Sequence, residues 1–148
     1  MKKVILFDID YTLFDTYKFR RAIYQTIKEY LENKKIKDLD NILAETYIHS
    51  RTKWGIFIPE RFTEDLNSKL KSNIPFDFIE KNIAALNLFD RHHYEEVEEV
   101  LRELNKVKNT TIGIFSSGEE GFQRSKIKKI IRHLHKDHLH IFMFKHDN

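Results

Sequence analysis

Three short apolar runs in the chain have the pattern of buried β-strands. Lys3 to Phe7 is apolar with β-branched residues, and acidic residues follow it directly. A run without polar alternation is typical of a strand buried on both faces, as in a parallel sheet. Thr110 to Phe115 and Ile141 to Phe144 repeat this pattern, so we expect three strands.

The long segment between the first two strands follows a helical pattern instead. Apolar residues recur there at three- and four-residue spacing, which gives each helix one apolar stripe. The first stripe consists of Phe19, Ile23, Ile27, Tyr30 and Leu31. Asp15 or Thr16 can cap the start of this helix. Similar stripes follow near Leu39, after Pro59 and after Pro75, so residues 17–88 are expected to be an all-helical insertion of about four helices.

Two further helices flank the second strand. Tyr94 to Val107 is amphipathic, with acidic residues early and basic residues late, as the helix dipole favours. A basic helix is expected at roughly Glu119 to His135. The order strand, helices, strand, helix, strand predicts an α/β fold whose parallel strands are joined by right-handed crossovers.

Composition narrows the class of protein. The 148 residues are 41% apolar and 33% charged, which is typical of a globular domain, with or without an insertion. The absence of cysteine excludes disulfides and thiolate metal sites and fits a reducing, cytoplasmic setting. The apolar runs are too short to span a membrane. Asp8 and Asp10 interrupt any signal peptide that Met1-Lys2-Lys3 could begin.

The net charge of +3 is mild, and its excess is concentrated in the late basic helix. Such a helix can bind nucleic acid, with an affinity that falls steeply with salt. No aromatic residues interleave the charges to stack bases, so we interpret them as a solvated helix face and expect no nucleic-acid partner. The basic residues are Arg124, Lys126, Lys128, Lys129, Arg132 and Lys136.

Polar side chains stand where the three expected strands end. Asp8 and Asp10 end the first, Ser116 and Ser117 the second, and Lys145 the third. Ligands of an open parallel sheet bind beyond the carboxyl ends of its strands. A carboxylate there can attack phosphorus, and a second can protonate the leaving oxygen and later deprotonate water. Hydroxyl, backbone N–H and ammonium groups can hold the phosphoryl oxygens, and Mg²⁺ can offset the repulsion between the acids.

Each of these features also has a plainer interpretation. The two acids could cap a strand end, the serines could belong to an ordinary loop, and Lys145 could be a solvated lysine. The histidines from His133 to His146 suggest a metal cluster, but only His135 and His138 are spaced as neighbours. Trp54 and Phe57 could recognise a substrate, although packing within the helical insertion is the simpler expectation.

The strand-end residues resemble two motifs of the haloacid dehalogenase-like superfamily, whose members use an aspartyl phosphate. Asp8-Ile9-Asp10-Tyr11-Thr12 is similar to its first motif, Asp-x-Asp-x-Thr. The strand that ends at Ser116-Ser117-Gly118 resembles the second, and Gln123-Arg124-Ser125-Lys126 resembles the helix start that commonly follows. Lys145 stands where the lysine of the third motif is expected.

The resemblance implies a role for each of these residues. Asp8 would be the nucleophile and a Mg²⁺ ligand, while Asp10 would be the acid/base and give its backbone carbonyl to the metal. Ile9, Ser116, Ser117 and Lys145 would bind the phosphoryl group. Because members that dehalogenate carbon generally lack the second acid, Asp10 favours phosphoryl transfer. Tyr11 departs from the pattern, because a glycine is common at its position.

The resemblance also implies the domain organisation. Residues 1–16 and 89–148 would form a Rossmann-like parallel-sheet core, and residues 17–88 an α-helical cap. The family's fourth motif, an acidic pair that completes the Mg²⁺ shell, has no counterpart before the sequence ends at Asn148. We therefore expect a truncated chain with an unpaired first strand and weakened Mg²⁺ binding, unless a second copy exchanges a strand in a homodimer.

These expectations give one leading function and two alternatives. The leading function is a Mg²⁺-dependent phosphatase that acts on a small phosphorylated metabolite. A phosphomutase of the same superfamily would use the same phosphoaspartate to return the group to an isomer. The third interpretation is a non-catalytic remnant that binds without turnover.

Overall fold

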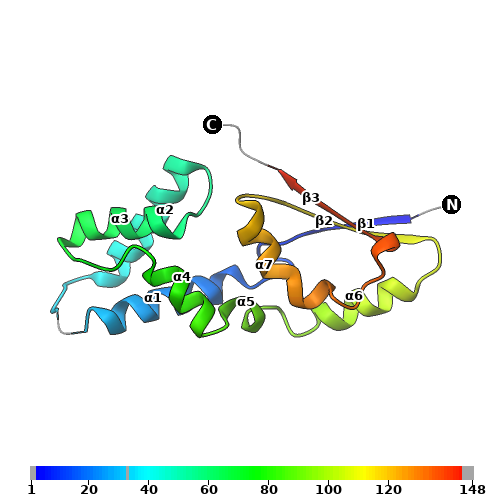
Figure 1. Ribbon diagram of the computed structural model, residues 1–148, viewed down its shortest axis with the longest axis horizontal. Coiled ribbons are helices and arrows are strands. Elements are labelled where there is room, and N and C mark those ends of the chain that lie inside the picture. The colour runs from blue at the N-terminus through cyan, green and yellow to red at the C-terminus, as the bar shows by residue number, and fades with distance from the viewer. Residues whose placement is uncertain (1–2, 33, 145–148) are drawn as a thin grey trace. The chain divides into compact units, whose positions relative to one another are not determined.

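The computed structural model describes residues 3–32 and 34–144, which form one sheet and a series of helices (Figure 1). The strands are β1 (Lys3–Asp8), β2 (Thr110–Ser117) and β3 (Leu139–Phe144), and the order in the sheet is β1-β2-β3. Both pairs of neighbouring strands are parallel. The predicted α/β fold with a Rossmann-like parallel sheet is thereby confirmed.

The helices follow the predicted order, with one short addition. The first strand leads into a run of helices, and two more helices flank β2, while the four-residue α5 was not foreseen. The helices are α1 (Thr16–Tyr30), α2 (Leu39–Trp54), α3 (Pro59–Leu70), α4 (Phe78–Ala85), α5 (Leu88–Arg91), α6 (Val97–Lys106) and α7 (Glu120–Ile131), and a 3₁₀ turn covers Lys136–His138. No helix within the described ranges is both long enough and apolar enough to cross a bilayer.

The chain divides into two compact units. The first consists of Met1–Tyr17 and Phe89–Asp147 and contains the sheet with α6 and α7. The second is the helical segment Lys18–Leu88. A helical unit of this size needs a core of its own to be stable.

The core of the helical unit consists of aliphatic and aromatic side chains. Leu43, Phe62 and Leu66 are fully buried. The Phe57 ring lies 5.1 Å from the Tyr47 ring and 5.7 Å from the Phe62 ring, measured between centroids. Phe57 therefore packs within its own unit, as the simpler sequence interpretation proposed.

The sheet of the first unit is covered on one face and exposed on the other. Helices α6 and α7 pack on β2 and lie on the same side of the sheet in Figure 1. Ile112 and Ile114 of β2 are almost fully buried, whereas Val4 and Leu6 of β1 are 63% and 60% exposed. The prediction that the first strand is buried on both faces is therefore wrong for the described residues. An unbroken apolar run shows that both faces of a strand carry apolar side chains. It does not show whether helices cover both faces of the sheet.

The register aligns the three strand ends. Asp8 pairs with Phe115, and Ser117 pairs with Phe144. Because the strands are parallel, their carboxyl ends meet at one edge of the sheet. Within the described part of the chain β1 is an edge strand, as the sequence predicted.

Candidate active site

A tight loop follows β1 and presents two acidic side chains. The Ile9 N–H donates to Oδ1 of Asp8 at 2.7 Å, and the Ile9 carbonyl accepts from the N–H groups of Leu13 and Phe14. Ile9 itself is fully buried and anchors the loop. Tyr11 turns the chain with a φ of 62°, a left-handed conformation that is uncommon for a residue with a side chain. The loop leaves Asp8 and Asp10 partly exposed at the sheet edge.

The Asp10 carboxylate is held on both of its oxygens. Lys126 Nζ lies 2.6 Å from Oδ1, and the Thr16 hydroxyl donates to the same oxygen at 2.5 Å. Gln123 Nε2 donates to Oδ2 at 3.0 Å. Two of these three donors come from α7, more than a hundred residues later in the chain.

The Lys126 ammonium is a buried charge. Its side chain is only 5% exposed, and it lies 5.5 Å from the centre of the Phe14 ring and 5.3 Å from that of Phe122. Burying a cation is costly unless an anion accompanies it. Asp10 supplies that anion, and the two aromatic faces add a weaker attraction.

These neighbours set the ionisation of Asp10. Burial alone would raise the pKa of the Asp10 carboxyl, but the Lys126 charge and the hydrogen bonds from Lys126, Thr16 and Gln123 lower it by more. The pKa of Asp10 therefore lies below its ordinary value of 3.8, and the group is a carboxylate at neutral pH.

The end of β2 is joined to this cluster through Gln123. Ser116 is buried and Ser117 is exposed. Gln123 Nε2, which donates to Asp10, also donates to the backbone carbonyl of Ser117 at 2.9 Å. Gly118 makes the approach possible: its φ is +139°, and a Cβ at that position would lie 2.9 Å from Gln123 Nε2. The first turn of α7 is capped by the Glu119 carboxylate, which accepts from the backbone N–H groups of Gly121 and Phe122.

The structure thus places most of the predicted site residues at one sheet edge. Asp8 ends β1 and Asp10 follows it, Ser116 and Ser117 end β2, and Gln123 bridges Asp10 to Ser117. Lys145 lies outside the described residues.

The structure corrects the interpretation of one lysine. Lys126 was grouped with the solvated face of the basic helix, but it lies on the buried side of α7. The buried residues of this helix are Gln123, Lys126, Ile127 and Ile130, at helical spacing. Projecting the apolar stripe of Ile127 and Ile130 backward along the helix would have placed Gln123 and Lys126 in the interior.

The donors at this edge suit a magnesium ion. Mg²⁺ is usually held by one or two carboxylates together with water, and rarely by a complete cage of protein ligands. The partly exposed Asp8 carboxylate and the Asp10 backbone carbonyl are donors of this kind. The Asp10 side chain is committed to Lys126 and Gln123 instead. Within the described residues no three His, Asp or Glu side chains form a cluster that could hold a metal by itself.

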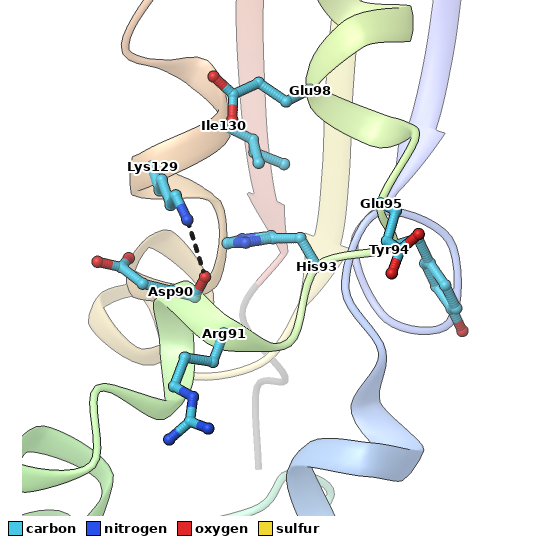
Figure 2. Close-up of a pocket in the computed structure, with 8 residues that line it drawn as sticks. All are labelled: Asp90, Arg91, His93, Tyr94, Glu95, Glu98, Lys129 and Ile130. Carbon is cyan, nitrogen blue, oxygen red and sulfur yellow. Dashed lines mark hydrogen bonds between the residues drawn. The ribbon is translucent and has the colours of Figure 1, made fainter.

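A separate cavity of about 380 Å³ lies between the α5–α6 loop and α7 (Figure 2). Its walls carry charges of both signs, and none of the predicted site residues line it. His93 projects from one wall toward α7, and its Nε2 contacts the Lys126 carbonyl at 2.5 Å. Because a carbonyl only accepts, Nε2 carries the proton. The cavity is lined by Asp90, Arg91, His93, Tyr94, Glu95, Glu98, Lys129 and Ile130.

Comparison with known proteins supports one family. A model of haloacid dehalogenase-like hydrolases matches residues 2–145. No curated protein matched the chain.

Solved structures share the fold at low sequence identity. A haloacid dehalogenase-like family hydrolase from Xanthomonas campestris is similar with a TM-score of 0.60 at 12% identity, over 95% of this chain and 61% of the other. The Bacillus subtilis protein YfnB, described as a HAD hydrolase bound to magnesium, has a TM-score of 0.56 at 13% identity, over 97% of this chain and 63% of the other. The chain therefore spans about three fifths of the length of these two proteins.

Proposed function

The chain belongs to the haloacid dehalogenase-like hydrolases, and on this premise we propose that it hydrolyses a small phosphate monoester through a phosphorylated Asp8. The observation that carries the proposal is the loop after β1. Asp8 lies at the carboxyl end of a parallel strand and is partly exposed. Asp10 lies two residues later, and its carboxylate forms an ion pair with Lys126.

The first half-reaction transfers the phosphoryl group to the protein. A carboxylate oxygen of Asp8 attacks phosphorus, the bond from phosphorus to the ester oxygen breaks, and the leaving oxygen takes a proton from Asp10. This step uses the protonated form of Asp10, which the lowered pKa makes the minor form at neutral pH. The Ser116 hydroxyl and the backbone N–H groups at the end of β2 are suited to bind the phosphoryl oxygens. Bound Mg²⁺, held by the Asp8 carboxylate and the Asp10 carbonyl, would supply positive charge against the phosphoryl group.

The second half-reaction restores the free protein. Asp10, now a carboxylate, takes a proton from water while the water oxygen attacks phosphorus, and the bond to the Asp8 oxygen breaks. Inorganic phosphate leaves, and Asp10 has regained the proton that it gave to the leaving group. Lys126 and Gln123 hold the Asp10 carboxylate in the form that this step needs.

The experiment that tests this function is release of inorganic phosphate from a panel of small phosphate monoesters and from p-nitrophenyl phosphate. We expect turnover with Mg²⁺, loss of turnover with a chelator, and at least a thousandfold lower kcat for Asp8→Asn. Equal phosphate release by the wild type and Asp8→Asn would overturn the proposal. Isomerisation of a sugar phosphate without net phosphate release would identify a phosphomutase instead.

A further inference from the structure

Helix α7 turns two polar side chains toward the interior, and both end on the same carboxylate. Gln123 and Lys126 stand at positions i and i+3 of the helix and are 6% and 4% exposed. The buried face of a helix normally carries apolar side chains, as α7 does at Ile127 and Ile130. These two side chains therefore do more than pack in the core: both contact the Asp10 carboxylate.

The surroundings hold this pair in one arrangement. Gly118 leaves the space that the Gln123 amide occupies, and the His93 ring contacts the Lys126 carbonyl and fixes the helix turn that carries the ammonium. The Phe14 and Phe122 rings flank the ammonium at 5.5 and 5.3 Å. Phe14 also contacts His93, with ring centroids 5.7 Å apart. Side chains from three separate segments thus determine where Nζ of Lys126 can lie.

The arrangement gives the two Asp10 oxygens different environments. Oδ1 receives Lys126 and Thr16, and Oδ2 receives Gln123 alone among the contacts that the structure gives for it. These hydrogen bonds restrict rotation of the Asp10 carboxylate about its Cβ–Cγ bond. A proton-transfer group must lie within hydrogen-bond reach of the oxygen that it serves, and a misplacement of about 1 Å can cost on the order of a hundredfold in rate.

We propose that Lys126, together with Gln123, is a positioning residue that orients Asp10 for proton transfer to the leaving group and from water. The inference rests on the proposed phosphatase function. Because Lys126 is buried, it acts through Asp10 and does not touch the substrate. Its removal therefore lowers the rate of the chemical steps and leaves substrate binding nearly unchanged.

The test compares Lys126→Met, Lys126→Arg and Gln123→Leu with the wild type in the full chain, with p-nitrophenyl phosphate and Mg²⁺. Lys129→Met is the matched control, because Lys129 lies on the same helix and its ammonium contacts the carbonyl of Asp90 instead of Asp10. We expect Lys126→Met to lower kcat about 30- to 100-fold and KM nearly in parallel, so that kcat/KM with p-nitrophenyl phosphate stays within about threefold. Lys126→Arg should recover part of the loss, Gln123→Leu should lose about tenfold, and Lys129→Met should match the wild type.

A second readout separates positioning from a general loss of structure. The p-nitrophenolate leaving group departs without a proton, so loss of Asp10 orientation slows the water step more than the first step. The fraction of protein that is phosphorylated at steady state, measured by intact mass after an acid quench, should therefore rise in Lys126→Met. A loosened fold would lower that fraction instead.

The outcomes are distinguishable. A wild type that neither releases phosphate nor becomes phosphorylated overturns the proposed function, and this inference with it. An active wild type with Lys126→Met equal to Lys129→Met leaves the function standing and overturns the positioning role. If Lys126→Met does not fold, Gln123→Leu decides by the same two readouts, because it removes one neutral hydrogen-bond donor and buries no new charge.

Discussion

The Lys126 ammonium lies 2.6 Å from Oδ1 of Asp10, although 116 residues separate the two in the sequence. This ion pair joins the loop after β1 to the helix after β2. It also fixes the charge of the second acid in the candidate active site. The stability of this part of the protein and the chemistry proposed for it therefore depend on the same contact.

Removing the anion of this pair should destabilise the protein. Asp10→Asn keeps the shape of the side chain but leaves the buried Lys126 without a counter-charge, so we expect the free energy of unfolding to fall by about 2 kcal/mol. Urea unfolding of Asp10→Asn, Lys126→Met and the double variant measures the coupling as a double-mutant cycle. Strictly additive losses would contradict the account.

The ion pair also predicts a dependence of stability on pH. The pKa of Asp10 is lower in the folded than in the unfolded protein, so its contribution is fully present above about pH 4 and is lost as the pH falls through the folded value. In Lys126→Met the main cause of that lowering is gone. The difference in unfolding free energy between the wild type and Lys126→Met should therefore be largest near pH 6 and shrink below pH 4. A difference that stays constant from pH 3 to pH 7 would be inconsistent with this role of Asp10.

Gly118 should tolerate no larger residue. Gly118→Ala would place a Cβ 2.9 Å from Gln123 Nε2 at a φ of +139°, so we expect a loss of about 2 kcal/mol and a lower kcat. Gly121→Ala is the control: it lies in the first turn of α7, its Cβ would approach only the Glu119 side chain, and alanine favours helix. In thermal unfolding Gly118→Ala should lose clearly more stability than Gly121→Ala, and equal shifts would count against the packing described for Gln123.

The helical unit contains a pair of acids that repel each other. The Glu60 carboxyl, through a hydrogen bond and through its charge, raises the pKa of Glu80 above the ordinary 4.5. A raised pKa of an acid means that folding loses stability as the pH rises through that value. Because Glu80 is exposed, Glu80→Gln should gain only about 0.3 kcal/mol at pH 7 and nothing at pH 3. Urea unfolding at the two pH values checks this, and a loss of stability at pH 7 would show that the repulsion is not real.

The sequence predicted the elements and the strand-end acids because both depend on local patterns. The apolar runs of β1, β2 and β3 and the acids at Asp8 and Asp10 are visible in a few consecutive residues. The parallel pairing followed from the element order. These are the parts of the fold that the structure confirms.

The partners of Asp10 could not be predicted in the same way. A lysine in a basic helix is usually solvated, and its burial depends on which side of α7 meets the sheet. The exposure of Val4 and Leu6 likewise depends on which helices pack on that face of the sheet. The sequence of the strand itself does not specify those helices. Tertiary packing decides both, so these two features were the ones that the local pattern misjudged.

The central claim is that Asp8 becomes covalently phosphorylated, and peptide mass spectrometry tests it most directly. The protein is mixed with p-nitrophenyl phosphate and Mg²⁺, quenched in acid, and reduced with borohydride, which converts an aspartyl phosphate to homoserine. The account predicts homoserine at position 8 in the peptide that contains Ile9 and Asp10, and none in Asp8→Asn. Turnover of the substrate with an unmodified Asp8, or with the label on another residue, would contradict it.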